Sequence, residues 1–183
     1  MNKLFTLNLL EKTRVVFLEH FIIMKGPRGT AVCSGLNLIR NNECYVVLTK
    51  NSLAMFSKEA HVTNRKCLAI QNLFKKMLYG VHFYYSKKLF FVGIGFRVWT
   101  KFTNSGAVLI VKVRFSKDLY IPIPKDVCAL PLKPTLLLVR GISKESVNQF
   151  CNFICSFKKP DKYKGKGIQY KNEIIALKPS KQN

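Results

Sequence analysis

Two segments of the chain carry apolar residues at helical spacing. In Thr63–Leu78 and in Ser143–Phe157, large apolar side chains recur every three or four positions, which is the period of one face of an α-helix. Gly80 follows the first segment as a candidate C-cap. Ser143 is a candidate N-cap of the second segment, and Pro160 prevents that helix from continuing beyond the next turn. Both segments therefore predict one-sided helices that lie on a sheet.

Stretches rich in β-branched and aromatic residues precede each predicted helix. Two of the turns between them have clear signals, in KGPRG (Lys25–Gly29) and TNSG (Thr103–Gly106). Leu119–Ile123 contains Pro122 and is an edge strand at best, because proline cannot donate to a ladder. The predicted strands are Arg14–Met24, Thr30–Ile39 and Cys44–Thr49 in the first half, and Lys88–Thr100, Ala107–Phe115, Leu119–Ile123 and Thr135–Arg140 in the second.

The order of several strands followed by a helix occurs twice along the chain. It predicts an α+β fold with two tandem related domains, each a small mostly antiparallel sheet packed against one helix. Residues 1–80 are expected to form the first domain, with residues 1–12 as a divergent N-terminal extension ahead of the first strand. Residues 81–183 are expected to form the second, which ends in a basic loop and tail.

The charge of the chain narrows the classes of partner. It carries 31 Lys and Arg against 9 Asp and Glu, a net charge of +22, although 48% of its residues are hydrophobic. A folded core with this excess repels itself unless a polyanion neutralises it. Nucleic acid is the first candidate and an anionic membrane surface the second. No apolar run approaches the ~18 residues of a membrane-spanning helix, so no membrane insertion is expected.

Residues suited to catalysis or metal binding do not form recognisable sets. The histidines lack carboxylates or cysteines at metal-ligand spacing. VGIGFRV (Val92–Val98) lacks the third glycine of a dinucleotide fingerprint. Cys151 and Cys155, four residues apart, make a weak metal half-site, and reduced buried thiols explain them better. We therefore expect no enzymatic activity, no cofactor, no metal and no small-molecule substrate.

One lysine-rich stretch near the end of the chain has the composition of a nucleic-acid contact. In KKPDKYKGKGIQY (Lys158–Tyr170) the lysines would attract phosphates. Gly165 and Gly167 can adopt positive φ and let the backbone approach closely. Tyr163 and Tyr170 could stack on unpaired bases or pack on sugars. A flexible basic tail has the same composition, so composition leaves both interpretations open.

A second basic, glycine-bearing element is MKGPRGT (Met24–Thr30), a predicted hairpin tip with Lys25 and Arg28. On its own it is typical of an ordinary solvated turn.

Four segments, in order and spacing, resemble signatures of the large-subunit ribosomal protein six family. KPDKYKGKGIQY (Lys159–Tyr170) resembles the family's Tyr-Lys-Gly-Lys-Gly signature nearly position for position. The other three are IIMKGPRG (Ile22–Gly29), KKLFFVGIGFRV (Lys87–Val98) and LKPTLLLVRGISKESVNQF (Leu132–Phe150). One such motif is weak evidence, whereas four in register are strong.

The resemblance implies a structural, non-enzymatic protein of the large ribosomal subunit with two related α+β domains. It implies binding to large-subunit rRNA near the sarcin–ricin loop and the base of the factor-binding stalk, beside neighbouring large-subunit proteins. Gln169 and Lys162 depart from the family's loop pattern, and Ser143 and Asn148 from its helix pattern. The implied rRNA-binding residues are Lys158, Lys159, Tyr163, Lys164, Gly165, Lys166, Gly167 and Tyr170, with Lys25 and Arg28 from the first-domain hairpin.

An alternative function is a peripheral protein that binds anionic membrane surfaces. It requires an amphipathic helix with Lys and Arg along its polar side. Ser143–Phe157 offers only Lys144 there, which disfavours this alternative.

The compartment is a separate expectation. The 14 Phe and only 10 Gly, together with abundant Lys, Asn and Ile, suggest an AT-rich gene such as organellar genomes carry. The ~12 residues ahead of the first predicted strand are too few for a typical transit peptide, and they contain an acidic residue, Glu11. We expect a mitochondrial ribosome and a protein made inside the organelle, with a plastid or a bacterial cytoplasm as alternatives.

Overall fold

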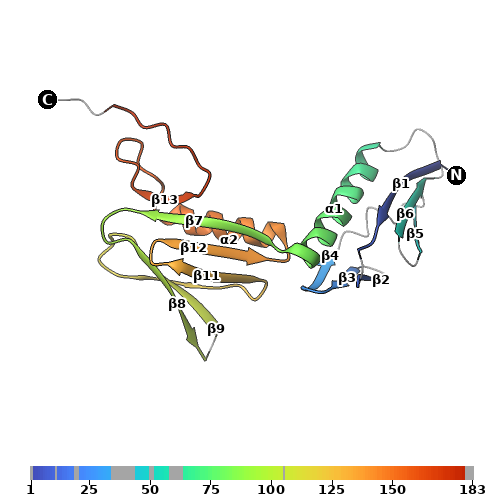
Figure 1. The fold of residues 1–183 in the computed structure, drawn as a ribbon, viewed down its shortest axis with the longest axis horizontal. Coiled ribbons are helices and arrows are strands. Elements are labelled where there is room, and N and C mark those ends of the chain that lie inside the picture. Colours follow the sequence, from blue (N-terminus) through green and yellow to red (C-terminus); the bar gives the residue numbers. More distant parts are fainter. Residues whose placement is uncertain are drawn as a thin grey trace. The chain divides into compact units, whose positions relative to one another are not determined.

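The computed structural model describes residues 2–10, 12–18, 21–33, 44–49, 52–57, 64–104 and 106–179. The chain divides into two compact units, Met1–Tyr84 and Tyr85–Asn183 (Figure 1). Helix α1 ends the first unit, and the first strand of the second unit begins two residues after that helix. The α+β class predicted from the sequence is confirmed, although the described residues of each unit form two small antiparallel sheets rather than one.

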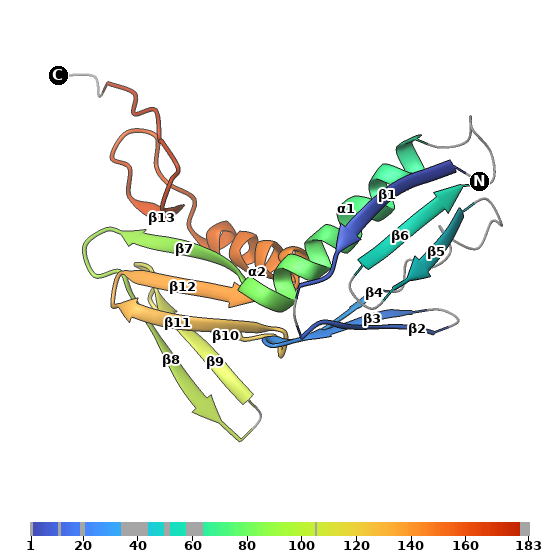
Figure 2. The ribbon, with the colours of Figure 1, turned by 45° about the vertical axis from the view of Figure 1, so that its right-hand side comes forward.

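The first unit places a long helix against two three-stranded sheets (Figure 2). Helix α1 (Asn64–Phe83) contacts strands of both sheets, and its buried residues Ile70, Phe74, Met77 and Val81 recur at helical spacing. One sheet has the order β1-β6-β5, with β1 (Asn2–Asn8), β5 (Cys44–Leu48) and β6 (Ser52–Ser57). The other has the order β2-β3-β4, with β2 (Arg14–Phe17), β3 (Ile22–Gly26) and β4 (Gly29–Cys33).

The prediction that Gly80 caps the first helix is wrong. The helix continues to Phe83, and Tyr84 then adopts the positive φ of 55° that ends it. Gly80 is buried within the helix, and Val81 beside it packs on Gly26 of β3. Tertiary packing of the last turn therefore overrides the local stop signal. The predicted first helical residue, Thr63, lies outside the described residues.

The strand predictions of the first half need three corrections. Arg14–Met24 is two antiparallel strands, β2 and β3, because the chain turns back between them, with the Leu18 N–H donating to the Phe21 carbonyl at 2.8 Å. β1 lies in the segment expected to precede the first strand, and it pairs with β6, which was not predicted either. β4 covers the start of Thr30–Ile39, whose residues 34–39 lie outside the described residues. Cys44–Thr49 is confirmed by β5.

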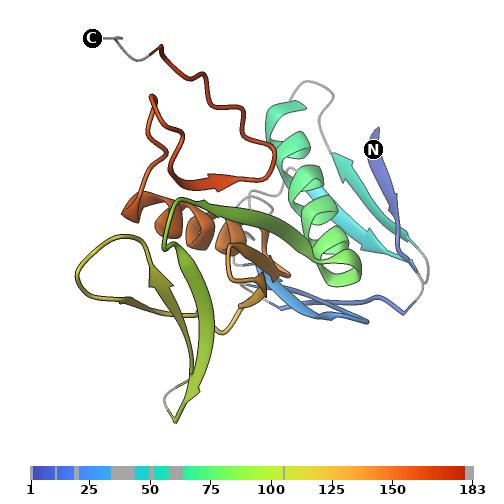
Figure 3. The same ribbon diagram turned by 60° about the vertical axis from the view of Figure 1, so that its left-hand side comes forward.

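The second unit packs helix α2 over a four-stranded sheet (Figure 3). Helix α2 (Lys144–Phe157) begins after Ser143, whose hydroxyl accepts the Ser146 N–H, so the predicted N-cap is confirmed. Its residues Val147, Phe150, Cys151 and Ile154 are buried in one core with the sheet. That sheet has the order β11-β12-β7-β13, with β7 (Tyr85–Val92), β11 (Val127–Lys133), β12 (Leu136–Gly141) and β13 (Gly167–Tyr170).

A second sheet of this unit has the order β10-β9-β8. It is formed by β8 (Arg97–Thr103), β9 (Gly106–Lys112) and β10 (Leu119–Pro122), and β10 is the edge strand that its prolines predicted. The predicted strand Lys88–Thr100 is wrong, because the chain bends after β7. Gly93 and Gly95, with φ of 153° and 79°, turn the chain from one sheet into the other. β11 and β13 were not predicted.

Candidate nucleic-acid interface

The lysine-rich stretch begins where α2 ends. Phe157 is the last helical residue, and Lys158 leaves the helix with extended φ and ψ of −148° and 90°. Pro160 follows two residues later and cannot support another helical turn. The chain then forms a loop that returns to the sheet as β13, antiparallel to β7. We call residues 158–167 the lysine–glycine loop.

Asp161 organises this loop from within. Its carboxylate accepts the backbone N–H groups of Tyr163 and Lys164, each at 3.2 Å. Its own carbonyl accepts the Gly165 N–H at 2.9 Å, and its N–H donates to the Lys166 carbonyl at 2.9 Å. These bonds close a tight turn of the kind that aspartate favours. The loop is therefore an ordered turn and not a solvated tail.

The two glycines are required by the geometry of the loop. Gly165 has φ of 65°, which places it in the left-handed region. Gly167 has φ of 155°, and a Cβ there would stand 2.6 Å from the Pro160 Cα and 2.7 Å from the Lys159 carbonyl oxygen. The Ile168 N–H donates to the Lys158 carbonyl at 2.9 Å. The two arms thus touch at the base of the loop, and a side chain at 167 would separate them.

The lysines of the loop carry a concentrated positive charge. Lys158, Lys159, Lys162 and Lys164 are exposed and Lys166 is half-buried. The acidic residue among them, Asp161, has its carboxylate turned to backbone N–H groups. Lysine side chains held at such a turn can approach phosphates without first ordering the backbone.

The two tyrosines differ in accessibility. The Tyr163 side chain is 57% exposed and presents its ring to solvent. Tyr170 is half-buried, its hydroxyl donates to Asn152 Oδ1 of α2 at 2.5 Å, and Lys87 Nζ lies 4.6 Å from its ring centroid. Burial raises the pKa of the Tyr170 phenol, and the nearby Cys155 raises it further. Tyr170 therefore fastens β13 to α2, and Tyr163 is the accessible ring.

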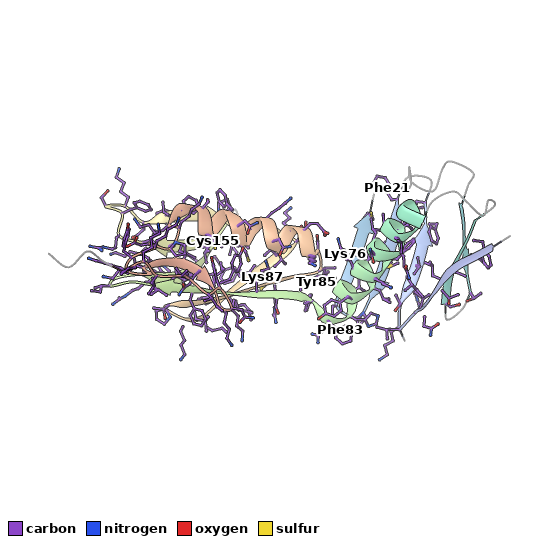
Figure 4. The ribbon with its side chains drawn as sticks, turned by 90° about the horizontal axis from the view of Figure 1, so that it is seen from above. Phe21, Lys76, Phe83, Tyr85, Lys87 and Cys155 are labelled. Carbon is purple, nitrogen blue, oxygen red and sulfur yellow. The ribbon has the colours of Figure 1, made fainter. Side chains whose placement is uncertain are left out.

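Cys151 and Cys155 of α2 lie in or against the same core as Tyr170. Figure 4 labels Cys155 on α2 and Lys87 on β7. Burial raises the pKa of the Cys151 thiol to about 12 and that of Cys155 to about 11. Such thiols stay protonated at neutral pH and make poor nucleophiles or metal ligands. Within the described parts of the chain, no group of three or more His, Cys, Asp or Glu could hold a metal ion.

The structure adds cations that the sequence did not single out. The Lys178 N–H donates to the Lys162 carbonyl at 2.9 Å, so the C-terminal segment runs beside the loop. The Lys171 N–H donates to the Lys88 carbonyl at 3.0 Å, which continues the pairing beyond β13. Lys162 was part of the lysine-rich stretch in the sequence, but it was not among the rRNA-binding residues that the family pattern implied. The positions of Lys171 and Lys178 depend on the return of the chain after β13, for which no local signal exists.

The basic hairpin of the first unit is packed against its own helix. The Arg28 N–H donates to the Val81 carbonyl at 3.1 Å, its Cζ lies 5.3 Å from the Tyr84 ring centroid, and the Tyr84 hydroxyl donates to the Arg28 carbonyl at 3.1 Å. A cation at the C-terminal end of α1 is favoured by the helix dipole. Arg28 thus has a structural role in the first unit, whereas Lys25 is exposed.

The fold and the loop define a basic α+β protein of two units that presents an ordered lysine–glycine loop suited to a polyanion. Comparison with known proteins shows which family within this class the chain is similar to. The chain is 32% identical to large ribosomal subunit protein uL6 of Chlamydia pneumoniae over 162 residues, 87% of this chain and 84% of that protein. It is 35% identical to the Rhodopirellula baltica uL6 protein over 136 residues, 74% of this chain and 70% of that protein.

The uL6 protein of Treponema pallidum is 31% identical over 160 residues, 86% of this chain and 84% of the relative. No protein-family model matches the chain. The identities and the coverage nevertheless establish that the chain belongs to the family of large ribosomal subunit protein uL6. The family resemblance of the four sequence segments is therefore confirmed.

Proposed function

We propose that this protein is a structural, non-enzymatic constituent of the large ribosomal subunit that binds large-subunit rRNA chiefly through the lysine–glycine loop. One observation carries the proposal: the Asp161 hydrogen bonds hold in place a loop whose exposed side chains are mainly lysines. The rRNA-contacting residues proposed are Lys158, Lys159, Tyr163, Lys164, Gly165, Lys166 and Gly167, with Tyr170 as the anchor of the loop and with Lys25 and Arg28 as a weaker second set.

Salt dependence tests the loop directly. Removing one lysine–phosphate interaction should reduce the slope of log affinity against log salt by about one. We expect Ala substitution of Lys158, Lys159, Lys164 and Lys166 together to weaken rRNA binding and flatten that slope. A matched control replaces Lys117, Lys125, Lys133 and Lys144, which are exposed residues of the same unit, and removes the same charge. Equal effects of the two variants would show that net charge, and not the loop, sets the affinity.

The place of the protein in the subunit is tested separately. The proposal puts the loop on rRNA near the sarcin–ricin loop and the base of the factor-binding stalk, beside other large-subunit proteins. Hydroxyl-radical footprinting of subunits with and without the protein should show protection there. The protein should also co-sediment with large subunits through a high-salt wash. Release at moderate salt, or protection confined to other rRNA regions, would contradict the placement.

A mitochondrial ribosome is the compartment we propose, with a protein made inside the organelle. The support is compositional, namely 14 Phe against 10 Gly, whereas the relatives compared are bacterial. Immunodetection in purified mitochondrial ribosomes would support the proposal. Detection in plastid ribosomes or in bacterial cytoplasmic ribosomes would replace it.

The alternative of a membrane-surface protein gains little from the structure. In the described parts of the chain, no helix is both long enough and apolar enough to span a membrane. The exposed residues of α2 include Lys144 but otherwise Glu145, Gln149, Asn152, Phe153 and Ser156, which is not a basic membrane-binding face. Flotation with anionic liposomes after nuclease treatment distinguishes the two functions, and recovery with the liposomes would favour the membrane.

A further inference from the structure

The outer face of the β10-β9-β8 sheet carries two exposed aromatic rings in one row. Strand pairing places Trp99 opposite Ile110, and Ile110 opposite Tyr120. Trp99 is 37% exposed and Tyr120 is 69% exposed, whereas Ile110 between them is only 5% exposed. Since neighbouring strands lie about 4.8 Å apart, the two aromatic residues stand about 10 Å apart across the sheet.

This row points away from the core of the unit. Val98, Leu109, Val111 and Ile121 alternate with the aromatic row along the same strands, and all four are buried in the core with α2. Because side chains alternate between the faces of a strand, the aromatic residues belong to the opposite face. The β8–β9 hairpin also extends beyond the four-stranded sheet of its own unit (Figures 1 and 2).

Cations flank the row. Arg97 is paired directly with Lys112, and Lys101 lies two residues beyond Trp99 on the same face; all three are exposed. Like charges directly opposite each other in a sheet are destabilising, and a bound anion would relieve that repulsion. The chain has no acidic residue between Glu59 and Asp118. Asp118, half-buried just before β10, is the acidic side chain closest in sequence to the row.

We propose that Trp99 and Tyr120, flanked by Arg97, Lys101 and Lys112, form a second RNA contact that stacks unpaired bases. We call this surface the aromatic face. It rests on the proposed function only in taking RNA as the partner class, because none of its residues belongs to the lysine–glycine loop. Aromatic rings stack on any exposed base, while the adjacent cations hold the phosphates. Bases inside a duplex are already stacked, so the surface should favour single strands.

Trp99 is the only tryptophan in the sequence, and its fluorescence therefore reports on this surface alone. The full-length protein is titrated with a single-stranded oligouridylate decamer, with a duplex RNA of the same length, and with vesicles of phosphatidylglycerol and phosphatidylcholine. We expect saturable quenching by the single strand at concentrations where the duplex has little effect. Absence of quenching by the decamer, equal quenching by the duplex, or a response to vesicles alone would overturn the proposal.

Variants of Tyr120 separate stacking from charge. Tyr120→Ala should weaken decamer binding about 5- to 150-fold, the range expected when one base–aromatic stack is removed, whereas Tyr120→Phe keeps the ring and should bind like the native protein. The double variant Arg97→Gln and Lys112→Gln should flatten the salt slope by about 1.4, since each contact to a single strand contributes about 0.7. Tyr120→Ala binding unchanged from the native protein would overturn the stacking role.

A loop variant distinguishes failure of this proposal from failure of the proposed function. Lys164→Ala with Lys166→Ala should weaken binding to structured rRNA but leave quenching of Trp99 by the decamer intact. If the decamer quenches Trp99 while the loop variant binds rRNA normally, the aromatic face stands and the loop is not the main contact. If loop substitution abolishes the quenching as well, the aromatic face is not an independent site and the proposal fails.

Discussion

Asp161 is an acidic residue that holds a basic loop in its conformation. Its negative charge opposes binding to a polyanion, but its carboxylate and backbone make four hydrogen bonds that set the course of the loop. Loss of the negative charge should strengthen rRNA binding, whereas loss of the hydrogen bonds should weaken it. Substitution of Asp161 can therefore separate the two effects.

We expect Asp161→Ala to weaken rRNA binding although it raises the net charge, because two backbone N–H groups lose their acceptor and the loop loses its fixed conformation. Asp161→Asn is the matched control, since it removes the same charge but keeps a side-chain oxygen that can support the turn. Filter binding at fixed salt measures both. Tighter binding by the Ala variant would show that charge outweighs order.

Gly167 gives a second prediction at this scale. An added methyl would meet backbone atoms of Lys159 and Pro160 at 2.6–2.7 Å, and backbone cannot move aside as a flexible side chain can. We expect Gly167→Ala to lower the free energy of unfolding by about 2–3 kcal/mol, as measured by urea denaturation. Gly95→Ala is the control, because Gly95 also has positive φ but a Cβ added there would have no atom within 4 Å. It should cost about 1–2 kcal/mol, and an equal loss in both variants would exclude the steric explanation.

At the scale of elements, the contact between α2 and β13 brings two thiols and a phenol into one interior. A cysteine thiol of the unfolded chain has a pKa near 9.0, and burial raises the folded pKa of Cys151 to about 12. A raised folded pKa means that the stability is complete below pH 9 and is lost as pH rises toward the folded value. The contact is therefore sensitive to alkali.

We expect the free energy of unfolding to fall between pH 9 and pH 11, and Cys151→Ala to reduce that fall. The measurement is urea denaturation at each pH, with Trp99 fluorescence as the probe. Cys128→Ala is the control, because Cys128 is exposed on β11 and its replacement should leave the pH dependence as in the native protein. An unchanged slope in the Cys151 variant would contradict the assignment.

Elements with strong local periodicity could be predicted from the sequence, and elements defined by pairing could not. α2 was correct to within a residue because its cap, apolar stripe and following proline are all local signals. β13 consists of four residues that follow a glycine-rich loop, and it is a strand only because β7 offers an open edge. β1 is a similar case, since its pairing with β6 is what defines it as a strand.

The residues of the candidate site likewise fall into those that the sequence predicted and those that it could not. The lysines and glycines of the loop were visible in the sequence, and so was their family pattern. The role of Asp161, the burial of Tyr170 and the positions of Lys171 and Lys178 depend on the return path of the chain. The aromatic face depends on the register of β8, β9 and β10. The sequence did not separate β8, because the predicted strand Lys88–Thr100 joined it to β7 of the other sheet.

At the scale of the whole molecule, the net charge of +22 is a source of instability in the free protein. The Debye length falls from about 30 Å at 0.01 M salt to about 8 Å at 0.15 M, so salt screens the repulsion between distant cations. We expect the thermal midpoint of the second unit, followed by Trp99 fluorescence, to rise by a few degrees over this range of sodium chloride. A gain of ~1 kcal/mol corresponds to about 4–8 °C for a unit of the size of Tyr85–Asn183.

A bound polyanion should stabilise further than salt alone, because it neutralises cations at fixed positions and binds the native state by preference. Heparin at low salt should therefore raise the thermal midpoint, and dextran of similar mass, which is uncharged, should not. At 0.5 M sodium chloride the effect of heparin should vanish, since counterion release no longer favours binding. A midpoint that is insensitive to both salt and heparin would mean that the positive charges are already compensated within the fold. In that case the excess charge would not be evidence for a polyanionic partner, and the proposed RNA contacts would rest on the geometry of the loop and the aromatic face alone.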